Sequence, residues 1–79
     1  MEHILKAVKM LRNNKREEAH KIAQDDQTMI GSWLHGIVHI IEGDELNARY
    51  WYKKASRTFP GINSAESEIE AIYNYATNH

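Results

Sequence analysis

The sequence predicts an all-α protein of about five helices, folded as a single domain over residues 1–79. Apolar side chains recur at helical spacing in several segments, and no segment alternates apolar and polar residues as a strand does. Only one proline and four glycines interrupt the chain. Because a chain of 79 residues has a thin core, each helix is expected to share its apolar face with a neighbour.

The first predicted helix covers residues 2–12 and the second covers residues 15–24, so that residues 1–26 form a first hairpin. The pair Asn13-Asn14 separates the two helices, because asparagine favours turns and left-handed helix ends. The apolar residues that recur on one face of these helices are Ile4, Leu5, Val8, Leu11, Ala19, Ile22 and Ala23.

A second hairpin is predicted over residues 29–60. Its first helix covers residues 30–41, and its second helix runs from about Glu45 to Thr58. Gly43 stands between them, where glycine commonly ends a helix. The apolar arc of the first helix consists of Ile30, Trp33, Leu34, Ile37, Val38, Ile40 and Ile41.

The last predicted helix covers residues 63–77. Asn63 and Glu66 have the spacing of a capping pair at its start. Glu68 and Glu70 add acidic groups near the positive end of the helix dipole.

Small and bulky residues stand at fixed spacing through residues 29–62, namely Gly36, Gly43, Asp44, Ala48, Tyr52, Ala55 and Pro60. This stretch resembles a tetratricopeptide repeat, in which two antiparallel helices pack closely through small residues. The resemblance implies that Gly36 meets Ala48 and Ala55. It also implies that Tyr52 fills the interface, that residues 1–26 are a degenerate copy, and that the last helix is a solubilising cap.

The same region also resembles a group of uncharacterised proteins. They share a His-Gly-x-x-His stretch, a Glu-Gly-Asp turn and an Asn-Ala-x-Tyr-Trp-Tyr run. Here the three stretches begin at His35, Glu42 and Asn47. This resemblance implies no particular activity.

His35 and His39 are four residues apart on one predicted helix, so their side chains share a face, which Glu42 continues. Two imidazoles and a carboxylate suit zinc or nickel, and they are the candidate metal ligands. In the alternative interpretation the histidines are structural and hydrogen-bond to Tyr52, Asn47 or a backbone carbonyl. A pH-dependent contact is a further alternative.

The sequence predicts a non-catalytic module for protein–protein contact, with self-association into a homodimer as one form of that contact. A metal- or ligand-binding histidine site with a sensing or hydrolytic role is the alternative. No cysteine, glycine-rich phosphate loop or strained serine elbow supports an enzyme. The candidate partner-binding residues are Trp33, Ile37, Ile40, Ile41, Leu46 and Tyr50. Alternatively, the first four of them are ordinary core beneath the first hairpin.

Ten basic and eleven acidic residues leave a net charge of −1, which argues against a nucleic-acid partner. The basic face that holds Arg49, Lys53 and Arg57 is therefore interpreted as solvated, with RNA binding as a weaker alternative. No apolar run approaches the roughly 18 residues of a membrane span, so no membrane partner is expected. The absence of cysteine fits a reducing compartment, and we expect a cytoplasmic protein.

Overall fold

The computed structural model describes residues 1–78 and confirms the all-α prediction. His79 lies outside the described residues. The helices are α1 (Glu2–Arg12), α2 (Arg16–Gln24), α3 (Met29–Ile41), α4 (Glu45–Lys54) and α5 (Ala65–Thr77). None of the helices in the described part of the chain is both long and apolar enough to cross a bilayer.

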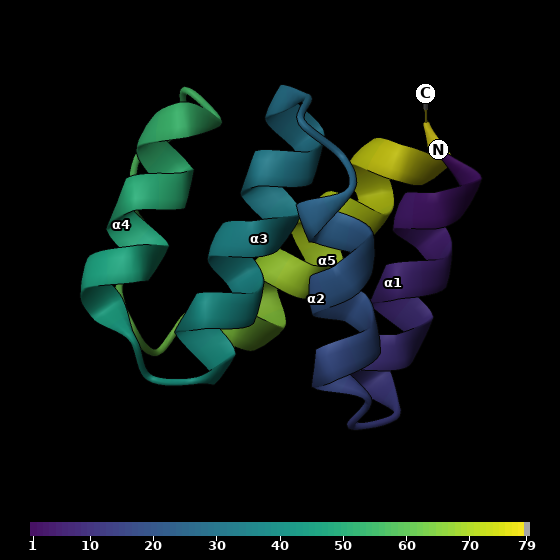
Figure 1. Ribbon diagram of the computed structural model, residues 1–79, viewed down its shortest axis with the longest axis horizontal. Coiled ribbons are helices and arrows are strands. Elements are labelled where there is room, and N and C mark those ends of the chain that lie inside the picture. The colour runs from purple at the N-terminus through teal and green to yellow at the C-terminus, as the bar shows by residue number, and fades with distance from the viewer. Residues whose placement is uncertain (79) are drawn as a thin grey trace.

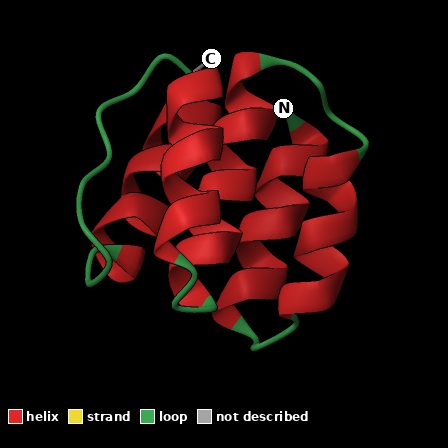
Figure 2. Cartoon of the chain, turned by 60° about the vertical axis from the view of Figure 1, so that its left-hand side comes forward, coloured by secondary structure: helices red, strands yellow, loops and turns green. Residues whose placement is uncertain are grey.

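Four of the helices form two antiparallel hairpins, and the fifth helix, α5, packs against both of them. α1 pairs with α2, α3 pairs with α4, and α2 packs against α3 (Figure 1). α5 crosses behind the hairpins, in contact with both α1 and α3. Short loops join α1 to α2 and α3 to α4, whereas a longer loop connects α4 to α5 (Figure 2). The last helix therefore binds to both hairpins.

Three helices end in the same hydrogen-bonded arrangement, in which a residue with positive φ follows the helix. That residue is Asn14 after α1, Gly43 after α3 and Ser56 after α4. After α3, for example, the amide of Gly43 donates to the carbonyl of Ile40, and the amide of Asp44 donates to the carbonyl of His39. These bonds satisfy carbonyls that the end of a helix would otherwise leave unpaired.

The predicted end of α4 at Thr58 is wrong, because the helix ends at Lys54. Ser56 takes the left-handed conformation that glycine usually supplies, with a φ of 58°. The amide of Arg57 then bonds to the carbonyl of Tyr52 and closes the helix end. The chain turns there, and the guanidinium of Arg57 lies 3.5 Å from the centre of the Trp33 ring.

The predicted capping pair at the start of α5 does not form. The residue before the helix is Ser64, and it makes no side-chain hydrogen bond to the first turn. Its hydroxyl donates instead to the carbonyl of Gly61, at 2.7 Å. The loop after Pro60 thus sets the start of α5 at Ala65, two residues later than the sequence predicts.

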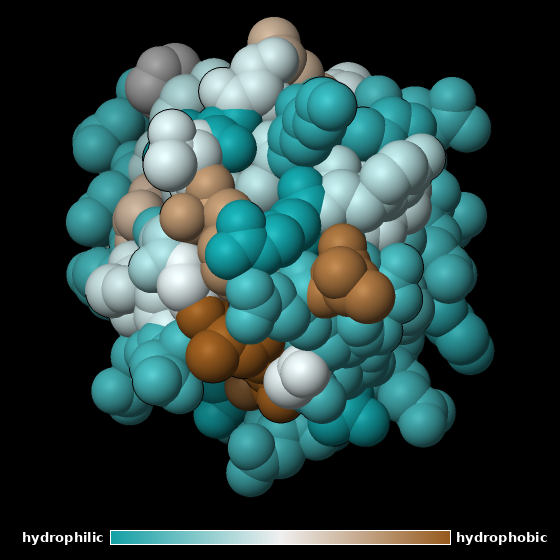
Figure 3. Space-filling model, turned by 90° about the vertical axis from the view of Figure 1, so that its left-hand side faces the viewer, coloured by the Kyte–Doolittle hydropathy of each residue, from teal (hydrophilic) through white to brown (hydrophobic). Residues whose placement is uncertain are grey.

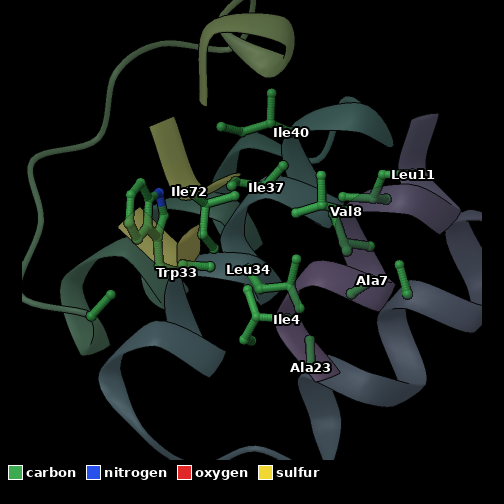
Figure 4. Packing of buried hydrophobic residues seen from close by; sticks show 14 of the residues in the cluster. Ile4, Ala7, Val8, Leu11, Ala23, Trp33, Leu34, Ile37, Ile40 and Ile72 are labelled. Carbon is green, nitrogen blue, oxygen red and sulfur yellow. The ribbon is translucent and has the colours of Figure 1, made fainter. Parts of the chain in front are cut away.

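The core lies between α1, α3 and α5. Figure 4 shows Ile4 and Val8 of α1 facing Leu34 and Ile37 of α3. Ile72 of α5 closes the core from a third side. Full burial of a side chain of this size contributes about 1.5–3 kcal/mol, so these contacts are the main source of stability.

α3 and α4 approach closely at Gly36. A Cβ atom built on this glycine would lie 2.5 Å from Cδ1 of Tyr52 and 3.5 Å from the backbone carbonyl oxygen of Ala48. Both Tyr52 and Ala48 are fully buried. The glycine therefore provides the space that the Tyr52 ring occupies.

The ring of Tyr52 carries a hydroxyl that links three helices. This hydroxyl donates to Oε1 of Glu68 on α5, at 2.7 Å. Nε1 of Trp33 on α3 donates to the same oxygen, at 3.0 Å. Burial and the Glu68 carboxylate raise the pKa of the Tyr52 phenol well above its usual range, which keeps it a donor.

Gly36→Ala is expected to destabilise the protein by about 1–3 kcal/mol, because the added methyl overlaps the Tyr52 ring. At an open helical site the same change stabilises by about 0.5–1 kcal/mol, so the sign itself is informative. Urea unfolding measures the change. Repeating Gly36→Ala in a Tyr52→Leu background serves as the control, and an equal loss there would contradict the steric explanation.

Tyr52→Phe is expected to cost about 1.5–3 kcal/mol, because it removes a hydrogen bond to a charged carboxylate. Tyr50→Phe is the matched control on the same helix, since Tyr50 is 54% exposed. We expect that control to stay within about 0.5 kcal/mol of the parent. Equal urea midpoints for both variants would show that the Tyr52 hydroxyl contributes nothing to stability.

Candidate metal centre

Three imidazole rings from two helices meet at the interface of the two hairpins. His20 lies on α2, and His35 and His39 lie on α3. One ring nitrogen from each residue can be chosen so that all three lie within 4.8 Å of one another. We call His20, His35 and His39 the histidine triad.

Local helix geometry explains how the triad forms. His35 and His39 are one helical turn apart, and their rings stack with centroids 5.1 Å apart and planes at 10°. On α2, the small buried residues Ala19 and Ala23 let the helix lie close to its neighbours. The His20 ring, next to Ala19 in the chain, then reaches the two α3 rings edge-on.

The shortest contact in the triad joins two nitrogens. Nε2 of His20 and Nε2 of His35 are 2.8 Å apart, a hydrogen bond that needs one ring to donate and the other to accept. Trp51 of α4 covers the other side of His35, with ring centroids 3.8 Å apart and planes at 9°. His35 is thus held between α2 and α4, and its residue is only 5% exposed.

Charged groups lie on one side of the triad. Oε1 of Glu42 is 3.1 Å from Nδ1 of His39, close enough for an ion pair although the two atoms are not aligned as a hydrogen bond. Oδ2 of Asp44 is 3.9 Å from the same nitrogen. Nε of Arg16 is 3.3 Å from the other oxygen of Glu42.

The surroundings favour neutral imidazoles at two of the three positions. Burial, with further contributions from His20 and His39, lowers the pKa of His35 to about 4. Burial and His39 also lower the pKa of His20, against the opposing effect of Glu42. Two cationic rings whose nitrogens are 2.8 Å apart would repel strongly, so the hydrogen-bonded pair does not carry two positive charges.

Nδ1 of His35 is buried and has no hydrogen-bond partner among the described residues. A buried polar group without a partner costs about 1–3 kcal/mol. The structural interpretation from the sequence expected the histidines to hydrogen-bond to Tyr52, Asn47 or a backbone carbonyl. Instead, Tyr52 donates to Glu68, and the side-chain amide of Asn47 donates to Asp44.

The structure brings His35 and His39 together as the sequence predicts, but the third imidazole is His20. Glu42, the predicted third ligand, lies beside the triad next to Nδ1 of His39 and is paired with Arg16. Sequence reasoning missed His20, whose only signal was a histidine next to a buried alanine on a helix with few apolar residues.

The predicted partner-binding residues divide between core and surface. Trp33, Ile37 and Ile40 are buried, so the core interpretation describes them correctly, and Ile41 is half-buried beside them. Leu46 is 83% exposed and Tyr50 lies near it on α4. Figure 3 views the side of the molecule that carries α4, and the apolar side chains there form separate small groups within a hydrophilic surface. Protein contact therefore stays a prediction.

Two cationic side chains of α4, Arg49 and Lys54, lie over the protein's own aromatic rings. Nζ of Lys54 lies 5.6 Å from the centre of the Tyr50 ring, the neighbour expected from helical spacing. The same nitrogen lies 5.2 Å from the centre of the Trp51 ring. Arg49 lies over Phe59, at 4.5 Å.

The chain matches no protein-family model, no curated protein and no solved structure. The tetratricopeptide resemblance accordingly stays a prediction.

We expect the metal-free protein to lose stability as the pH falls from 7 to 5. His35 has a pKa of about 4 when folded and an ordinary value of 6.5 when unfolded. In that interval the unfolded chain binds a proton that the folded chain does not, so acid favours unfolding. His20 acts in the same direction, because burial and His39 lower its pKa too. Above pH 6.5 the His35 ring is neutral in both the folded and the unfolded chain, so the stability that acid removes is fully present there.

Urea midpoints at pH 7 and pH 5, measured with a chelator present, test this expectation. His35→Phe keeps an aromatic ring against Trp51 and removes the titrating group, so its midpoint should fall less over the same interval. A parent protein with equal midpoints at the two pH values would contradict the expectation.

Proposed function

We propose that this protein binds one divalent transition-metal ion, of the zinc or nickel type, through the histidine triad. The observation that carries the proposal is the convergence of three imidazole nitrogens from α2 and α3 within 4.8 Å. Neutral imidazole is a preferred ligand of such borderline cations. The lowered pKa values of His20 and His35 support the proposal, because protons compete less for their lone pairs at pH 7.

The distances require only small movements of the side chains. Zinc–nitrogen bonds of about 2.0–2.1 Å place two nitrogens of a tetrahedral site about 3.3 Å apart. The His20–His35 pair, at 2.8 Å, would open by about half an ångström, and the remaining distances would shorten from at most 4.8 Å. The His20 and His39 side chains are half-buried, and we expect their rotation to accommodate this change.

A purely structural role explains the cluster less well. The interface between α2 and α3 holds three polar rings, and two of their nitrogens, Nδ1 of His35 and Nδ1 of His39, are buried without a hydrogen-bond partner among the described residues. Apolar side chains of similar volume would fill this space without that desolvation cost. Coordination of an ion by the lone pairs of all three rings would explain why imidazoles occupy this interface, which side-chain packing alone does not explain.

Zinc should bind with a stoichiometry of one ion per chain and raise the melting temperature. At a free zinc concentration of 100 times Kd, mass action adds about 2.7 kcal/mol of stability. For a domain of this size that corresponds to a shift of roughly 10–20 °C. Calorimetric titration and thermal melts, repeated with nickel, provide the measurements.

The matched variants are His20→Ala and His3→Ala, each of which removes one histidine. His20 belongs to the triad, whereas His3 bonds to Asp26 in the loop that follows α2. We expect His20→Ala to lose the thermal shift and His3→Ala to keep it. The proposal fails if zinc leaves the parent protein's melting temperature unchanged, or if both variants respond equally.

A further inference from the structure

We infer that an ion in the triad keeps one coordination position for a small anionic ligand from solution, such as azide or a carboxylate. This inference rests on the proposed function, since it concerns the same site. It differs from the sequence-based expectation, in which Glu42 is itself a ligand and the site is filled by protein groups.

The first step is the count of donors. Among residues 1–78, the ligand group around this point consists of His20, His35 and His39 only. Structural zinc sites usually have four protein ligands, whereas sites that exchange a ligand have three. Three imidazoles therefore fit the exchanging type.

The second step is the position of Glu42. Its carboxylate oxygen lies 3.1 Å from Nδ1 of His39, and this negative charge favours the tautomer with the proton on Nδ1, although the two atoms are not aligned as a hydrogen bond. That tautomer leaves the lone pair of His39 on its Nε2 atom. His20 and His35 contact each other through their own Nε2 atoms. With the ion bound at Nε2, the His39 ring separates Glu42 from it. Arg16 holds the second oxygen of Glu42 on the outside.

The third step is the charge. Three neutral imidazoles leave the full 2+ charge of an ion in place. Glu42 and Asp44 contribute two negative charges near His39, and Arg16 returns one positive charge. The net charge of the ion and these three side chains is +1. Because the site is partly buried, this positive charge favours an anion over a neutral ligand in the remaining position. Glu42 is then a positioning residue that acts through His39.

Cobalt(II) in place of zinc provides a spectroscopic test, because its visible absorption reports the ligands directly. We expect the cobalt-loaded protein to show a band that shifts on addition of azide and saturates at one azide per ion. Glu42→Gln should keep the azide shift while weakening cobalt affinity by about 10–100-fold, as expected for a group that orients a ligand. Glu17→Gln, an exposed change on α2, is the control and should alter neither.

The results separate the two proposals. A protein that takes up no cobalt overturns the proposed function and, with it, this inference. A protein that binds cobalt but shows an azide shift only after Glu42→Gln has Glu42 as its fourth ligand, which overturns the inference and leaves the proposed function standing. An azide-insensitive spectrum in both proteins overturns the inference as well.

Discussion

The close contact between α3 and α4 at Gly36 is the constraint on which the rest of the structure depends. Because glycine leaves room for the Tyr52 ring, the two helices can lie near enough for their side chains to meet on both flanks. On one flank Tyr52 and Trp33 both donate to Glu68 and so attach α5. On the other flank Trp51 stacks on His35. One small residue thus determines both the attachment of the last helix and one wall of the histidine triad.

The two faces of α3 serve different purposes. Toward α1 and α5 it presents Leu34 and Ile37, which are fully buried and supply hydrophobic stability. Toward α2 it presents imidazoles, which form a hydrogen bond where an apolar interface would be expected to contribute more. The polar face therefore fits a role in binding better than a role in folding.

Much of the fold follows from local rules that the sequence displays. Helical periodicity predicts the five segments, and Gly43 predicts the turn between α3 and α4 because glycine tolerates its φ of 74°. The end of α4 was missed because Ser56 takes a positive φ without being glycine, and tertiary contacts of Arg57 accompany it. His20 was missed for another reason. Spacing along one helix reveals His35 and His39, whereas a ligand from a second helix depends on how α2 packs against α3, which periodicity does not determine.

An ion at the triad would act on the contact between the hairpins, because its ligands come from α2 and α3. Without an ion, the His20–His35 bond joins the same two helices, but one hydrogen bond contributes only about 0.5–1.5 kcal/mol. Metal–imidazole bonds are much stronger, and only the folded chain assembles the three rings, so binding free energy would add to folding free energy. The buried Nδ1 of His35, which has no hydrogen-bond partner among the described residues, would then lower the stability of the metal-free state only. If the proposed ion binds, the triad would lower the stability of the metal-free protein relative to the metal-bound protein, and the docking of the two hairpins would depend on the supply of metal.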